Sequence, residues 1–182
     1  MTAPLSFAAK PTLTGDRVIL RPTGPQDVDD LMANLSEAEL VRLTGTHRAF
    51  TRTEIEEYCS SRAGTGDRLD LAVLDRSSGE YLGELAITEL DPDNRSCGFR
   101  IALRTAATGR GYGTDATRLI LDHVFALGVH RVELEVYAFN PRARHVYEKA
   151  GFVHEGTLRQ ALRWDGEWVD AAIMAVLATD PR

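Results

Sequence analysis

Three glycines lie close together in the run Thr108-Gly109-Arg110-Gly111-Tyr112-Gly113-Thr114. Glycine lets the backbone approach a bulky anion, because no Cβ stands in the way. A helix that begins here adds N–H groups without acceptors and the positive end of its dipole. The run therefore predicts a binding site for a phosphate or diphosphate group. The alternative is a turn that only requires positive φ.

Two other phosphate-binding motifs fit this run less well. A Walker-type loop ends in Gly-Lys-Ser or Gly-Lys-Thr, and the absence of lysine here disfavours hydrolysis of a nucleoside triphosphate. The spacing Gly111-x-Gly113-x-x-Ala116, with Glu133 further along, matches the dinucleotide-binding fingerprint. That fingerprint follows its strand directly and opens a series of parallel βαβ units, whereas antiparallel strands precede the run here. A dinucleotide site is therefore disfavoured.

Alternating apolar residues and turn signals predict the strands that hold the glycine run. They are expected over 11–20 (a hairpin turning at Gly15-Asp16), 69–74, 81–90, 96–103, 132–136, 152–153 and 169–177. The short turns at 75–79 and 91–94 imply an antiparallel meander.

Helix signals lie between and after these strands. Capping-box spacing is present in Thr23 with Gln26 and in Thr51 with Glu54. The expected helices follow Thr23, span about 52–62, run from Thr114 to a closing Gly128, and run from a cap at Asn140 with Pro141 in the first turn to Gly151. Residues 36–50 show no clear pattern.

The order of these elements predicts an α/β (α+β) fold. We expect one mixed, largely antiparallel central sheet of about six or seven strands with helices on both faces. A length of 182 residues favours one domain, here 11–182 after an N-terminal tail over 1–10.

Composition narrows the class of protein further. The formal net charge of −6 argues weakly against a protein that coats nucleic acid, and no apolar run is long enough to span a membrane. Cys59 and Cys97 lack metal-ligand spacing and are interpreted as buried free thiols. Residues 1–10 do not resemble a secretory signal, and together these features predict a cytoplasmic protein without a metal.

The glycine run and several later segments resemble the GNAT N-acetyltransferase superfamily. Its signature is Gln or Arg, two residues, Gly, one residue, then Gly or Ala, and Thr108 departs from the first position. The segments 127–136, Asn140, 146–152 and 155–156 resemble the RimJ/RimL branch, and 16–22 match its usual start. The similarity covers roughly residues 12 to 178.

The resemblance implies a GNAT-like acyl-CoA N-acyltransferase fold, with acetyl-CoA as cosubstrate and a primary amine as acceptor. Direct attack in a ternary complex is expected, with a protein or peptide N-terminus as acceptor. The alternatives are a small-molecule (antibiotic or polyamine) acetyltransferase and a non-catalytic acyl-CoA sensor. A homodimer is left open, and neither nucleic acid nor a membrane is an expected partner.

The same resemblance assigns roles to individual residues. The cofactor-binding residues are expected to be Ile101, Ala102 and Leu103 beside the pantetheine arm, Thr108, Gly109, Arg110, Gly111, Tyr112, Gly113 and Thr114 at the diphosphate, and Asn140. Arg142 and Arg144 are interpreted as solvated helix residues, with contact to the outer phosphate of CoA as the alternative. Tyr147 is expected to protonate the departing thiolate.

Attack requires a neutral amine, so a general base is needed for acceptors of high pKa. Glu84 is the first candidate, and Glu133 and Glu135 are alternatives. Trp164 and Trp168 flank a predicted hairpin tip, where they either line an acceptor pocket or pack.

Overall fold

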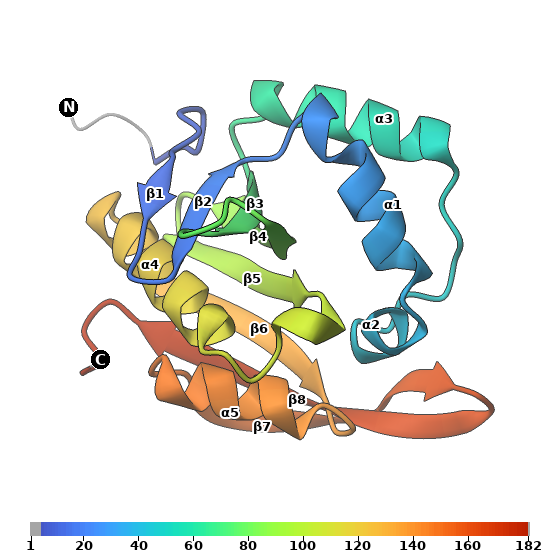
Figure 1. The fold of residues 1–182 in the computed structure, drawn as a ribbon. Coiled ribbons are helices and arrows are strands. Elements are labelled where there is room, and N and C mark those ends of the chain that lie inside the picture. Colours follow the sequence, from blue (N-terminus) through green and yellow to red (C-terminus); the bar gives the residue numbers. More distant parts are fainter. Residues whose placement is uncertain (1–4, 182) are drawn as a thin grey trace.

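One sheet organises the computed structural model, which describes residues 5–181 (Figure 1). Within these residues the sheet has eight strands in the order β1-β2-β3-β4-β5-β6-β8-β7. The strands are β1 (Leu13–Thr14), β2 (Val18–Pro22), β3 (Leu69–Asp75), β4 (Tyr81–Asp91), β5 (Ser96–Leu103), β6 (Arg131–Tyr137), β7 (Val153–Trp164) and β8 (Glu167–Leu177). All neighbours pair antiparallel except β5 and β6, which confirms a mixed, largely antiparallel sheet.

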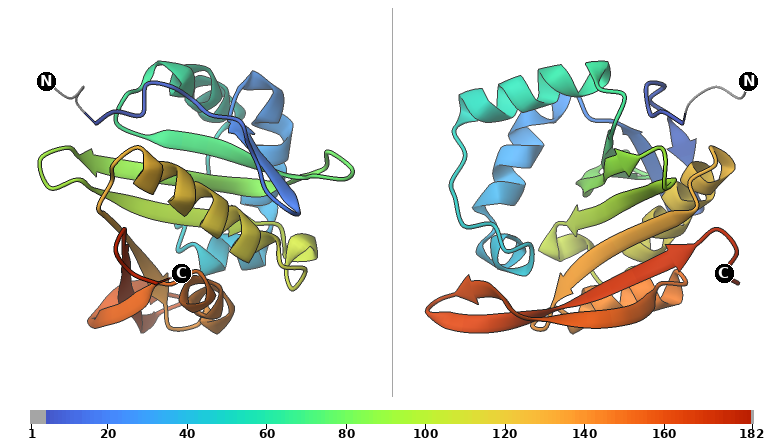
Figure 2. Two further views of the ribbon diagram at one scale, coloured as in Figure 1. Left: turned by 90° about the vertical axis from the view of Figure 1, so that its left-hand side faces the viewer. Right: turned by 180° about the vertical axis from the view of Figure 1, so that it is seen from behind.

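Helices cover both faces of this sheet (Figure 2). The α-helices are α1 (Val28–Ser36), α2 (Ala38–Leu43), α3 (Arg52–Ser61), α4 (Tyr112–Ala126) and α5 (Pro141–Lys149), with 3₁₀ turns at Pro25–Asp27, Arg62–Gly64 and Thr105–Ala107. α4 and α5 pack with the main core, whereas α1 and α3 share a second buried cluster on the opposite face. The expected helix–sheet–helix arrangement is confirmed.

Local capping explains two of these helices. Thr51 accepts a hydrogen bond from the N–H of Glu54, and the Glu54 carboxylate accepts one from the N–H of Thr51, which is the predicted capping box of α3. Asn140 accepts from the N–H of Ala143 and Pro141 occupies the first turn of α5, also as predicted.

Other predicted boundaries are wrong. Gly24, not Thr23, precedes the first helical turn, and the Asp27 carboxylate closes that cap by accepting from the N–H of Gly24 at 2.9 Å. α4 begins at Tyr112 rather than Thr114, because Gly111 takes the left-handed conformation at its N-cap. No local pattern predicts α2, and the sheet has eight strands where about six or seven were expected.

The start of the described chain contributes to the core. Phe7 is fully buried and its N–H donates to the carbonyl of Gly66 at 2.8 Å, although residues 1–10 were expected to form a tail. Residues 1–4 of that segment lie outside the described residues. Cys59 and Cys97 are both buried and free, which confirms their interpretation. In the described chain no helix is both long and apolar enough to cross a membrane.

The sheet opens between its two parallel strands. β5 and β6 pair only from Ser96 to Gly98 against Arg131 to Glu133, and their remaining residues diverge. β6 continues to pair with β8 on its other side, and β5 continues to pair with β4. From Phe99 to Leu103, β5 therefore presents a free backbone edge to the opening.

Candidate active site

The glycine run forms a cradle of backbone amides, which we define as residues 109–114. Gly109 and Gly111 have positive φ values of 76° and 83°, which L-residues with side chains rarely adopt. Among the described residues, no acceptor takes the N–H of any of these six residues. Consecutive free N–H groups at a helix N-terminus form a binding site for an anion.

Neighbouring contacts hold the cradle in place. The Asp115 carboxylate accepts from the N–H groups of Arg17 and Val18 at 2.8 and 3.1 Å, which ties the first turn of α4 to β2. The buried Tyr112 hydroxyl donates to the Asp75 carboxylate at the end of β3. The Arg110 guanidinium lies over the Tyr112 ring at 5.1 Å from its centroid. The amides are therefore positioned before any ligand binds.

The cradle adjoins the opening in the sheet. A Cβ on Gly113 would lie 3.6 Å from both Leu103, at the end of β5, and Val146 of α5. The free edge of Ile101, Ala102 and Leu103 thus continues from the cradle. An extended arm attached to a bound diphosphate can pair with this edge as an added strand.

Tyr147 faces the opening from the side of α5. Its ring lies edge-on to Phe99 with centroids 6.1 Å apart, and Phe99 is the first β5 residue beyond the paired stretch. Burial raises the pKa of Tyr147 well above its usual range, and no described residue hydrogen-bonds its hydroxyl. The hydroxyl therefore keeps its proton at neutral pH and is free to donate it.

Glu84 lies on the other face of the sheet, toward α1 and α3. It pairs in register with Ala102 on β5, next to the opening. Its carboxyl makes no hydrogen bond or ion pair with the described residues, and burial raises its pKa while Arg100 lowers it. A desolvated carboxylate of this kind is a suitable general base.

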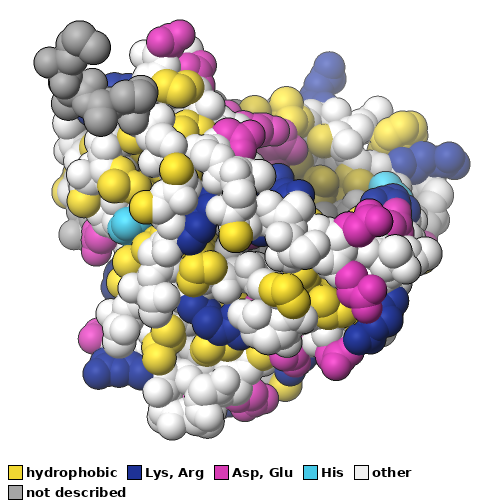
Figure 3. All heavy atoms as spheres, turned by 90° about the horizontal axis from the view of Figure 1, so that it is seen from above, with side chains coloured by type: hydrophobic (Ala, Val, Ile, Leu, Met, Phe, Trp, Pro, Cys, Tyr) yellow, Lys and Arg dark blue, Asp and Glu magenta, His cyan; other side chains and the backbone are white. Residues whose placement is uncertain are grey.

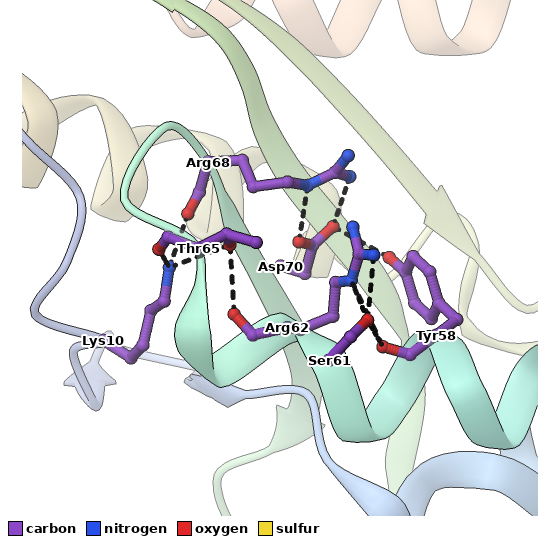
Figure 4. A network of polar contacts seen from close by, with 7 residues as sticks. All are labelled: Lys10, Tyr58, Ser61, Arg62, Thr65, Arg68 and Asp70. Carbon is purple, nitrogen blue, oxygen red and sulfur yellow. Dashed lines mark hydrogen bonds and ion pairs between the residues drawn. The ribbon is translucent and has the colours of Figure 1, made fainter.

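Two buried carboxylates on this side of the sheet, Asp70 and Asp27, are already paired. Asp70 accepts from Arg68 at 2.7 and 2.6 Å and from the Tyr58 hydroxyl at 2.8 Å, within the polar network drawn in Figure 4. Asp27 is bound by Arg21 at 2.8 and 2.6 Å. Among these three acidic side chains, Glu84 alone is left without a described partner.

The alternative bases are placed differently. Glu133 forms an ion pair with Arg131 at 3.1 Å, and that arginine also binds Glu155. Glu135 is exposed on β6, on the sheet face shared with Glu84. Within residues 5–181 no cluster of His, Cys, Asp and Glu side chains could hold a metal ion.

The segment without a sequence pattern wraps one end of this face. A Cβ on Gly45 would meet the Tyr137 ring, and Arg42 of α2 lies over the ring of Phe139. His47 stacks on Trp164 at the hairpin tip, with ring centroids 5.2 Å apart. Trp164 thus packs on the α2–α3 connection, whereas Trp168 is 59% exposed. None of these long-range contacts had a local signal in the sequence.

Two surface depressions accompany the site. Seen from above, the molecule is hollowed, with hydrophobic side chains on the floor and acidic side chains, basic side chains and a histidine around the rim (Figure 3). A second depression adjoins Gly111 and Thr114 and carries the basic side chains of Arg17, Arg118 and Lys149. No local sequence pattern marks these three residues as part of a site.

Comparison with known proteins agrees with this geometry. A family model described as an acetyltransferase (GNAT) domain matches residues 17–153. Spermidine N(1)-acetyltransferase of Vibrio cholerae is 30% identical over 106 residues, and this match covers 58% of the chain and 61% of that enzyme. The matched stretch therefore spans less than two thirds of that relative. The probable N-acetyltransferase YjcK of Bacillus subtilis is 30% identical over 131 residues, covering 71% and 72% of the two chains.

Solved structures share the fold. The crystal structure of Vibrio cholerae spermidine N-acetyltransferase, in complex with CoA and spermine, superposes with a TM-score of 0.83 at 24% identity and covers 90% of this chain and 96% of that one. A GCN5-related N-acetyltransferase from Brucella melitensis has a TM-score of 0.78 at 28% identity, covering 97% and 83%. Because the family model matches well over half of the sequence, this chain belongs to the GNAT acetyltransferase family, whose cosubstrate is acetyl-CoA.

Proposed function

We propose that this chain transfers the acetyl group of acetyl-CoA to a primary amine by direct attack in a ternary complex. The observation that carries the proposal is the row of six free amides at the cradle, which leads directly to the free edge of β5. The free N–H groups of the cradle suit a diphosphate, and the free backbone edge of β5 suits a pantetheine arm.

Each part of the cosubstrate has a proposed contact. Gly109 to Thr114 bind the diphosphate through N–H groups, and Thr108 borders it. Ile101, Ala102 and Leu103 pair with the pantetheine arm, and Asn140 lies beyond it at the start of α5. An N–H of the same strand polarises the thioester carbonyl, a contact that can be worth about 10²–10³ in rate.

The proposed chemistry uses the two faces of the opening. Glu84 accepts a proton from the ammonium group of the acceptor, and the neutral nitrogen attacks the thioester carbon. The C–S bond then breaks, Tyr147 donates its proton to the departing thiolate, and the proton left on the nitrogen of the intermediate returns to the Tyr147 phenolate. The two residues suit these roles because Glu84 is an unpaired carboxyl and Tyr147 is a buried phenol with a free proton.

We propose a small cationic amine, such as a polyamine, as the acceptor. A polyamine-like amine costs about 5 kcal/mol to deprotonate at pH 7, against about 1 kcal/mol for an α-amino group. Glu84 supplies the base that such an acceptor needs. The Vibrio cholerae relative named for spermidine supports the same class. The RimJ/RimL branch and an N-terminal peptide acceptor stay predictions, since the relatives reported above carry other names.

An acceptor screen tests this proposal. Release of free thiol is measured with acetyl-CoA and a panel of spermidine, an aminoglycoside, a free amino acid and short peptides with free N-termini. Turnover with the polyamine supports the proposal, and preferred turnover with peptides would restore the RimJ/RimL interpretation. Binding of CoA without turnover on any amine would instead support the acyl-CoA sensor.

Two further expectations stay proposals. A homodimer is compatible with β7, which forms a sheet edge and is largely exposed. Sedimentation of the purified chain measures its oligomeric state.

A reducing, cytoplasmic setting is compatible with Cys59 and Cys97, whose thiols are free.

A further inference from the structure

The first position of the family signature carries an unusual residue here. Thr108 stands where the motif usually has Gln or Arg, so the cradle lacks the long polar side chain of that position. Arg142 of α5 lies beside it, and its Nη1 donates to the Thr108 Oγ1 at 2.8 Å. A guanidinium from a different element has therefore taken a place next to the cradle.

The hydrogen bonds of Thr108 leave the anion contact to Arg142. The Thr108 hydroxyl uses its only proton on the carbonyl of Thr105 at 2.7 Å. It therefore has no proton left for a phosphate oxygen. Arg142 forms no ion pair with any described residue, and none of residues 5–181 accepts a hydrogen bond from its other N–H groups. Arg144, two residues further along α5 and also exposed, is instead paired with Glu148 at 3.0 Å.

The position of Arg142 is unfavourable for the helix that bears it. A cation in the first turn of a helix opposes the positive end of the helix dipole. The first turn of α5 contains no acidic residue that would compensate. The N-termini of α4 and α5 and the unpaired guanidinium therefore combine their positive potential at one place. A bound anion removes this repulsion.

We propose that Arg142 supplies, from α5, the diphosphate contact that the first residue of the signature usually supplies. Thr108 is then a positioning residue that holds the guanidinium at the cradle. This inference rests on the proposed binding of the cosubstrate diphosphate at residues 109–114. It changes the interpretation of Arg142 from a solvated helix residue to a ligand-binding one.

Calorimetry with two probes tests the inference. CoA and 3′-dephospho-CoA are titrated into the wild type, Arg142→Ala and the matched control Arg144→Ala. Arg142→Ala should weaken the binding of both probes by the same factor, roughly 10- to 100-fold, because a charged hydrogen bond to the shared diphosphate is lost. Arg144→Ala should bind like the wild type. The melting temperature without ligand should not fall in Arg142→Ala, since a cation is removed from a helix N-terminus.

A second variant, which restores an arginine at the first position of the signature, provides a further test. Thr108→Arg in the Arg142→Ala background should recover most of the lost affinity. A loss confined to CoA would place Arg142 at the outer phosphate and overturn the inference. Unchanged affinity in Arg142→Ala, with tight binding by the wild type, would overturn it while leaving the cradle intact. A wild type that binds neither probe would contradict the proposed function itself.

Discussion

Replacing Glu84 by glutamine separates catalysis from stability. The substitution keeps the shape of the side chain and breaks no hydrogen bond with the described residues. It removes the base proposed for the amine, so turnover should fall by about 10²–10⁴, the usual contribution of general base catalysis. Affinity for acetyl-CoA should not change, because Glu84 lies on the opposite sheet face from α4 and α5.

Although turnover should fall in Glu84→Gln, the thermal stability of this variant should rise at pH values above neutral. Burial raises the pKa of Glu84 in the folded protein, so the folded state loses stability as pH rises from the unfolded pKa of about 4.3 through the raised folded value. Glutamine lacks this penalty. The substitution also loses the attraction of Glu84 to Arg100 and Arg68, but Arg100 is exposed and screened by solvent, and Arg68 is already paired with Asp70. Glu84→Gln should therefore melt higher than the wild type at pH 8 and at the same temperature near pH 4.

The assay combines thiol release over a range of pH with thermal unfolding. The wild-type rate should rise as Glu84 loses its proton, and this limb should be absent in Glu84→Gln. Glu89→Gln, an exposed change on the same strand, is the matched control. Wild-type turnover in Glu84→Gln, together with a large loss in Glu135→Gln, would refute the reasoning and move the base to β6.

Three further predictions concern other parts of the molecule. Tyr147→Phe should lower turnover at least tenfold without changing CoA affinity in calorimetry; equal turnover would remove Tyr147 from the mechanism. Gly113→Ala should bind CoA normally, because its Cβ has room at 3.6 Å from Leu103 and Val146. Gly113→Val should bind CoA at least tenfold more weakly, and wild-type affinity in this variant would show that the pantetheine arm does not pass there. Glu54, whose pKa is lowered to about 2 chiefly by the N–H of Thr51, stabilises α3 above the unfolded pKa and loses that effect as pH falls toward 2. Glu54→Gln should thus melt lower at pH 7 but equally near pH 2, and a gap that persists in acid would contradict this.

Local sequence signals predicted the parts of the fold that depend on neighbouring residues. The capping box of Thr51 and Glu54 forms because its donors and acceptors lie within one turn. The same spacing at Thr23 and Gln26 does not form a capping box. Asp27 caps the helix instead, because its carboxylate accepts from the N–H of Gly24 and binds Arg21 of β2. A tertiary contact there decided between two locally similar caps.

The candidate site likewise has one part that local sequence predicts and another that depends on tertiary contacts. The glycine run could be predicted because its conformation and its free amides depend on consecutive residues. The opening beside it depends on where β5 and β6 stop pairing, which no local pattern encodes. α2 has one buried side chain, Leu40, and no apolar period, so its place follows from contacts with residues 137–139. The meeting of Arg142 with Thr108 likewise required the packing of α5 beside α4.

Amide chemical shifts measure the role of the cradle most directly. A ¹H–¹⁵N correlation spectrum of the labelled chain is recorded during titration with CoA. Because N–H groups that donate to a phosphate shift strongly, the largest changes should fall on Gly109 to Thr114, with smaller ones along Ile101 to Leu103. Saturable binding that leaves the amides of 109–114 unmoved would contradict the proposed diphosphate site.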